Sequence, residues 1–91
     1  MIITSAPRDY SFGVDDCACA MENIYLASQA LNIGCVWINQ LRDCCDDKNV
    51  RELLNKYGVP EDHVVYGSAA LGKIAVVPVG KERNMNAISY V

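Results

Sequence analysis

The chain has 91 residues, of which 52% are hydrophobic and 21% charged, and its net charge is −3. This length suits one small domain, so we expect residues 1–91 to form a single domain. The mild acidity excludes the basic stripe that nucleic-acid binding requires. The apolar fraction exceeds what a small monomer buries easily, which indicates association with another chain.

No segment has the features of a targeting signal or a membrane span. The apolar run at residues 64–79 is interrupted by two glycines, a lysine and a proline, which excludes a membrane helix. The apolar start, Met1–Ala6, is too short for a signal core and lacks a basic beginning. We therefore expect a cytoplasmic protein without a membrane partner.

Five cysteines in a chain without a secretion signal favour reduced thiols over a disulfide framework. Cys17 and Cys19 would lie about 200° apart around a helix, so the two thiols cannot easily coordinate one metal ion. Cys44 and Cys45 are adjacent, and the single histidine, His63, has no ligand neighbour at zinc spacing. We expect buried or incidental thiols and no metal ligands, with a metal or redox site as the alternative.

The first elements are a strand, a loop and a long helix. The apolar and β-branched residues of Met1–Thr4 predict a short strand. The segment Ser5–Gly13 carries proline, aspartate, serine and glycine, which predicts a loop. Asp15 or Asp16 is then placed to cap the helix and to complement its positive end.

The long helix has an apolar stripe at helical spacing. The stripe comprises Ala20, Ile24, Ala27 and Leu31, with Cys17, Met21 and Ser28 beside it. Its alanines allow a neighbouring helix or sheet to approach closely. Gly34, with Asn32 as a further stop signal, predicts the end of this helix.

The middle of the chain predicts a buried strand and a second helix. Cys35–Ile38 is a short apolar run suited to a strand, and Asp43–Asp47 predicts a polar turn. Asp46 or Asp47 would cap a helix that continues to about residue 57 and ends at Gly58 and Pro60. The apolar face of this helix comprises Val50, Leu53, Leu54 and Tyr57.

The last part of the chain predicts a strand and an arm. His63–Leu71 has the composition of a strand, and Gly72-Lys73 predicts a turn or bulge before β-type sequence at Ile74–Val79. Lys81–Val91 predicts a C-terminal arm. The order β-α-β-α-β gives an α+β or α/β arrangement, in which a central sheet is flanked by one long and one short helix.

Trp37-Ile38-Asn39-Gln40, at the end of the predicted middle strand, is the first candidate binding site. A Trp-Ile pair can offer an apolar surface to a ring system. The following backbone N–H groups and amide side chains can bond heteroatoms at the edge of the ring. The alternative is ordinary packing, because a buried tryptophan beside an isoleucine is usually core.

Lys81 and Arg83, which flank Glu82, form the second candidate site. Two cations could clamp a phosphate, with the arginine supplying forked hydrogen bonds. The alternative is a solvated, charged tail. No glycine-rich phosphate loop is present, and no motif ties a nucleophile to His63, so we predict no catalytic side chain.

Taken together, these segments resemble the C-terminal half of a nitroreductase-family protein. The matching segments are Asp16–Ala18, Met21–Ala27, Ala30–Gly34, Trp37–Asn39, Val50–Leu54, Gly58–Pro60, Gly67–Gly72 and Lys81-x-Arg83. The resemblance covers nearly the whole chain and rests on the order and spacing of these segments. It implies a partial nitroreductase-like α+β fold.

The resemblance also implies a function. Proteins of this family form intertwined homodimers that bind FMN at the interface and pass hydride from NAD(P)H to nitro compounds, quinones or flavins. Trp37–Gln40 would contact the flavin ring, and Lys81 and Arg83 its phosphate. The family's N-terminal, arginine-rich FMN segment has no counterpart here, and Met1 falls where its first central strand begins. A non-catalytic remnant or dimerisation module without flavin is therefore the alternative function.

Overall fold

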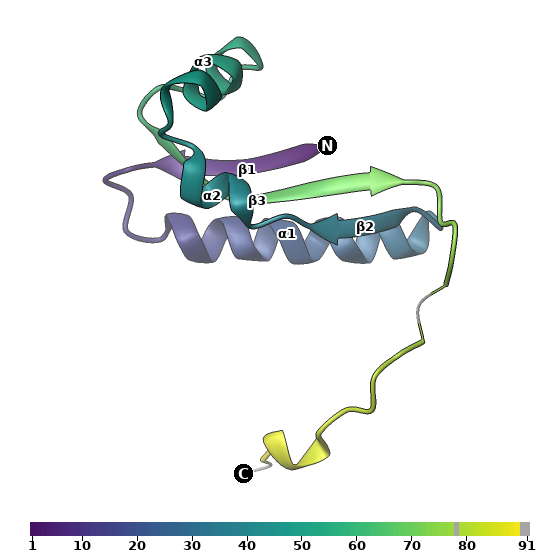
Figure 1. The fold of residues 1–91 in the computed structure, drawn as a ribbon. Coiled ribbons are helices and arrows are strands. Elements are labelled where there is room, and N and C mark those ends of the chain that lie inside the picture. Colours follow the sequence, from purple (N-terminus) through teal and green to yellow (C-terminus); the bar gives the residue numbers. More distant parts are fainter. Residues whose placement is uncertain (78, 90–91) are drawn as a thin grey trace.

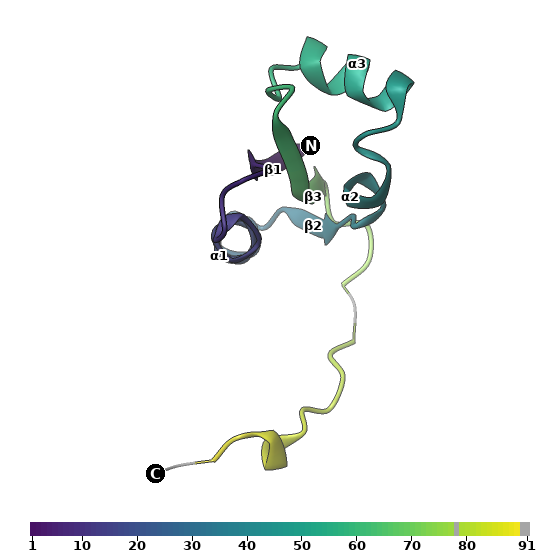
Figure 2. The same ribbon diagram turned by 90° about the vertical axis from the view of Figure 1, so that its left-hand side faces the viewer.

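Within residues 1–77 and 79–89, which the computed structural model describes, the chain forms a three-stranded antiparallel sheet with helices on both faces (Figures 1 and 2). In chain order the elements are β1 (Ile2–Pro7), α1 (Gly13–Ala30), β2 (Gly34–Trp37), α2 (Gln40–Cys44), α3 (Lys48–Lys56) and β3 (His63–Gly72). Helix α1 covers one face of all three strands, whereas α2 packs on β3 from the other face. The predicted α+β class is confirmed.

Strand β3 is the centre of the sheet, which has the order β1-β3-β2. β1 was expected to end at Thr4 but continues to Pro7, because a bulge between Thr4 and Ser5 lets Ser5–Pro7 pair with the start of β3. Gly67 allows α1 to approach the sheet. A Cβ atom there would lie 2.8 Å from the Cγ of Met21 and 2.9 Å from the Thr4 hydroxyl oxygen.

The buried stripe of α1 differs from the predicted one. Its buried residues are Gly13, Cys17, Met21 and Ser28. By contrast, Ala27 and Leu31 of the predicted stripe are exposed. Ala20 and Ile24 are half-buried. The buried side thus holds Cys17, Met21 and Ser28, which the sequence placed beside the stripe, because Gly67 leaves room for the long Met21 side chain.

The ends of α1 also correct the prediction. The helix begins at Gly13 rather than after an aspartate cap, and Asp15 and Asp16 lie in its first turn without capping it. At the other end Asn32, not Gly34, adopts the left-handed conformation, with φ of 55°. The N–H of Ile33 donates to the Ser28 carbonyl (2.8 Å), which completes a Schellman motif.

Helices α2 and α3 enclose a small core on the other face of the sheet. Its buried residues are Cys45, Leu54 and Val65. The predicted polar turn is partly wrong, because Gln40–Cys44 form α2. Leu41, on this short helix, and Cys45, just after it, pack into the core, which makes the helical turn favourable.

Helix α3 lies where the sequence predicts it, and its end is confirmed. Gly58 has φ of 87°, and the Val59 N–H donates to the Leu54 carbonyl at 3.0 Å. Its apolar face is narrower than predicted, because Leu53 and Tyr57 are exposed. Neither predicted aspartate cap forms, since the side chain of Asp47, at the cap position, makes no capping bond.

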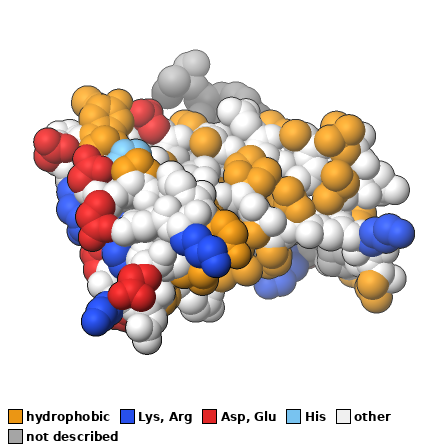
Figure 3. Space-filling view, turned by 90° about the horizontal axis from the view of Figure 1, so that it is seen from above, with side chains coloured by type: hydrophobic (Ala, Val, Ile, Leu, Met, Phe, Trp, Pro, Cys, Tyr) orange, Lys and Arg blue, Asp and Glu red, His pale blue; other side chains and the backbone are white. Residues whose placement is uncertain are grey.

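Asp46 instead joins two arginines from different elements. Arg8 and Arg51 both donate to its carboxylate, the latter at 2.9 Å. Arg51, which is buried, also donates to the carbonyls of Pro60 (3.3 Å) and His63 (3.0 Å). This network ties the end of β1 and the start of α3 to the start of β3. Figure 3 shows charged side chains gathered at this end of the molecule, around the histidine.

This network predicts an acid-sensitive contribution to stability. The hydrogen bonds from Arg8 and Arg51 lower the pKa of Asp46 from 3.8 to about 2. The folded state therefore holds this proton less tightly than the unfolded state. The resulting stability is present above pH 3.8 and is lost as the pH falls toward 2.

We expect Asp46→Asn to lower the urea midpoint of unfolding at neutral pH, and the gap from the wild type to shrink as the pH falls toward 2. Urea titrations across this pH range measure the gap. Asp9→Asn is the matched control, because Asp9 is exposed and makes no ion pair within residues 1–77 and 79–89. A gap that stays constant with pH would contradict the role of Asp46.

The chain after β3 leaves the body as an extended arm (Figure 1). Ile74–Val77 was expected to continue as a strand, but these residues pair with no strand of the described chain. Their side chains are exposed, as is Val79 at 95%. The arm then carries one 3-10 turn, Met85–Ala87. The parts of the predicted strand and arm at Pro78 and residues 90–91 lie outside the described residues.

Candidate functional site

Trp37 is the last residue of β2, the strand beside β3, and Ile38 follows it. We call residues 37–40 the strand exit. Ile38 is fixed through its backbone. Its N–H donates to the Ser68 carbonyl and its carbonyl accepts from the Ser68 hydroxyl, both at 2.8 Å. Because Ser68 is fully buried, these two bonds hold the strand exit in one position.

Trp37 packs against α1. Its ring centroid lies 6.5 Å from that of Tyr25, with the two ring planes tilted by 39°. The Trp37 Nε1 atom is buried and has no hydrogen-bond partner in residues 1–77 and 79–89. This N–H is a donor that the described chain leaves unpaired, on a residue whose ring lies beside Tyr25 of α1.

Asn39 and Gln40 turn the chain from β2 into α2, and both are exposed. Asn39 stands at the cap position, but its side chain makes no capping bond. No acceptor for its backbone N–H is found in the described part of the chain. The strand exit therefore presents unpaired amide donors next to an apolar pair, which suits the edge of a heteroaromatic ring.

Arg42 is a charged residue near this exit that sequence reasoning missed. Its guanidinium carbon lies 5.6 Å from the centre of the Tyr66 ring on β3. Its backbone N–H donates to the Asn39 carbonyl at 2.9 Å. Nothing in the sequence indicates this pair, because Arg42 lies between the predicted strand Cys35–Ile38 and the predicted turn Asp43–Asp47, and Tyr66 lies within the predicted strand His63–Leu71.

Lys81 and Arg83 lie on the arm, and both are exposed. The two ribbon views show that the arm runs away from the sheet and its helices (Figures 1 and 2). A single chain therefore does not bring this basic pair to the strand exit. Of the predicted site residues, only Trp37–Gln40 lie together.

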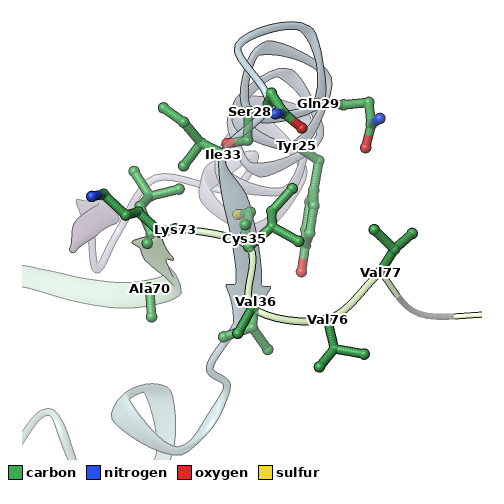
Figure 4. Close-up of a pocket in the computed structure, with 16 residues that line it drawn as sticks. Tyr25, Ser28, Gln29, Ile33, Cys35, Val36, Ala70, Lys73, Val76 and Val77 are labelled. Atoms are coloured by element: carbon green, nitrogen blue, oxygen red, sulfur yellow. The ribbon is translucent and has the colours of Figure 1, made fainter.

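A separate, open pocket of about 750 Å³ lies where the arm begins (Figure 4). It is lined by the last turns of α1, by β2 and by the first arm residues, including Tyr25, Ile33, Val36 and Val76. None of the predicted site residues lines it. Its apolar lining and the exposed valines beside it mark a surface that a further polypeptide could cover.

The cysteines and the single histidine are the other side chains that could carry chemistry. Cysteines occupy five separate positions without a disulfide, and the described residues contain no cluster of three metal-binding side chains. The Ser5 hydroxyl and the His63 Nδ1 lie 3.0 Å apart, which ties β1 to β3. No helix in residues 1–77 and 79–89 is both long and apolar enough to cross a membrane.

Comparison with known proteins identifies the family. A family model described as the nitroreductase family matches residues 1–73. An Archaeoglobus fulgidus protein, provisionally named NADH dehydrogenase/NAD(P)H nitroreductase, is 43% identical over 63 residues. The crystal structure of a Bacteroides fragilis nitroreductase with bound FMN superposes with a TM-score of 0.90 at 42% identity. The chain belongs to the nitroreductase family.

The matches differ in how much of each protein they cover. The aligned part is 69% of this chain but 34% of the Archaeoglobus protein. For the Bacteroides structure it is 98% of this chain and 49% of that one. The chain thus corresponds to about half of an FMN-bound nitroreductase, as the resemblance implied, and the superposition extends into the arm.

Proposed function

We propose that this chain acts in an FMN-dependent oxidoreductase of nitroreductase type, as a homodimer. The observation that carries the proposal is the superposition of 98% of the chain on an FMN-bound nitroreductase at 42% identity. A bound flavin would accept hydride from NAD(P)H and pass it to a nitro compound, a quinone or another flavin. The chain's own residues would bind and orient the cofactor.

The residues at the strand exit fit a flavin ring. Trp37 and Ile38 would contact the ring, while the Asn39 N–H, which lacks an acceptor in the described chain, would donate to a heteroatom at its edge. Gln40 would supply a second backbone or amide donor. The two hydrogen bonds between Ser68 and Ile38 would hold these groups in place, so little conformational freedom would be lost on binding.

The position of the arm supports the homodimer. Lys81 and Arg83 would bind the FMN phosphate, but their arm runs away from their own strand exit. The arm of a second copy could bring the pair to this site. The exposed valines of that second arm could cover the pocket of about 750 Å³ beside β2. The outer edge of strand β2 pairs with no other strand of the described chain, so it is open to such a partner.

Size-exclusion chromatography with light scattering and visible absorbance tests both parts of this proposal. We expect the chain to elute at the mass of a dimer, with flavin absorbance in the same peak. Fluorescence of Trp37, the single tryptophan, should fall on FMN addition because the ring would lie against it. Lys81→Gln with Arg83→Gln should weaken FMN binding by about tenfold or more, because two charged phosphate contacts are lost.

The matched control is Lys48→Gln with Lys56→Gln, which removes two cations from α3 and should leave FMN affinity unchanged. A colourless chain whose tryptophan fluorescence does not respond to FMN would overturn the enzymatic proposal. A dimeric but flavin-free chain would support the alternative, a dimerisation module without cofactor. A stable monomer would contradict the exchange of arms.

A further inference from the structure

Arg42 is held at the strand exit by two contacts. Its backbone N–H donates to the Asn39 carbonyl at 2.9 Å, at the start of α2, the short helix that follows the strand exit. Its side chain is exposed, and its guanidinium lies 5.6 Å from the centre of the Tyr66 ring, a contact that favours this position of the cation. Tyr66 is two residues from Ser68, the residue that binds Ile38, so both contacts place the cation beside the strand exit.

The charge of Arg42 is not neutralised by a neighbouring acid. Arg8 and Arg51 both pair with Asp46, whereas no carboxylate in residues 1–77 and 79–89 forms an ion pair with Arg42. Its contact with the Tyr66 ring does not cancel the charge of the guanidinium. A cation without an acidic partner among the described residues therefore stands next to the groups proposed to hold the flavin.

We propose that Arg42 stabilises the negative charge that hydride transfer adds to the flavin, and that Tyr66 is the positioning residue for Arg42. The inference rests on the proposed FMN function. Hydride carries two electrons and a proton, so its transfer leaves the nicotinamide positively charged and adds one negative charge to the flavin ring. A nearby cation lowers the energy of that charged form and raises the reduction potential.

The test is the reduction potential of bound FMN, measured by equilibration with a reference dye. We expect Arg42→Gln to shift the ratio of oxidised to reduced flavin by about tenfold toward the oxidised form. Arg42→Lys should show little of this shift, because it keeps the charge. Tyr66→Leu should reproduce part of it, because it frees the guanidinium. Lys56→Gln, which removes a charge from α3, is the matched control and should change nothing.

The outcomes separate this inference from the proposed function. A wild-type chain that takes up no FMN would overturn both. If FMN binds but its potential is the same in wild type and Arg42→Gln, only the inference fails. An equal shift in Lys56→Gln would also overturn it, because any loss of charge would then suffice. Should Arg42→Gln not fold, the potential in Tyr66→Leu decides the question.

Discussion

Met21→Ala is expected to lower the free energy of unfolding by about 2–5 kcal/mol, the largest effect of any single change considered for this chain. Met21 has 0% of its surface exposed and fills the space that Gly67 leaves between α1 and the sheet. Its removal loses buried apolar surface and leaves a cavity that the backbone of Gly67 cannot fill. Urea unfolding followed by circular dichroism, at fixed protein concentration, measures the change.

Leu26→Ala on the same helix is the matched control. Leu26 is 61% exposed, and both substitutions place alanine in the interior of α1, so their effects on helix propensity are similar and small. We expect Leu26→Ala to change stability by less than about 1 kcal/mol. Equal losses from the two variants would show that the orientation of α1 on the sheet is wrong.

Ser68→Ala is expected to cost about 1–3 kcal/mol of stability and to weaken FMN binding by roughly tenfold. The substitution removes the hydroxyl that donates to the Ile38 carbonyl at 2.8 Å. Because Ser68 is 0% exposed, water cannot readily replace this bond. The strand exit should become more mobile, so more conformational freedom would be lost when the cofactor binds.

Ser28→Ala is the control for Ser68→Ala in the unfolding measurement. Ser28 is also buried, but its hydroxyl donates to the Ile24 carbonyl within α1, at 2.6 Å. That carbonyl can keep its helical bond, so we expect a change within about 0.5 kcal/mol. If Ser68→Ala is as well tolerated as Ser28→Ala, the Ser68–Ile38 bonds do not determine the geometry of the strand exit.

The sequence predicted helix ends and strands well where interactions between neighbouring residues determine them. Gly58 ends α3 because a left-handed residue is needed there and glycine adopts it without strain. The run His63–Leu71 forms the central strand, since its small and β-branched residues suit a strand covered on both faces. The candidate site residues Trp37–Gln40 lie at the end of β2 as expected, although their contact with a flavin remains a prediction.

Predictions failed where a contact with a residue far along the chain determines the local structure. The buried side of α1 could not be read from its own spacing, because Gly67, 46 positions after Met21, determines which stripe fits the sheet. Neither Asp46 nor Asp47 forms a cap on α3. The Asp46 carboxylate instead accepts a hydrogen bond from Arg8, which is 38 positions away. Ser68 and Arg42 at the candidate site were missed for the same reason, since their partners are remote or on another element.

The sequence by itself determined the family and the α+β class, because order, spacing and turn residues are local properties. That Trp37–Gln40 meet a flavin ring stays a prediction. Only the tertiary structure decided that Trp37 packs on Tyr25 and that Ser68 fixes Ile38. It also decided that the arm, which carries Lys81 and Arg83, runs away from the strand exit of the same chain. These features depend on contacts between residues far apart in the chain, which a pattern of neighbouring residues does not encode.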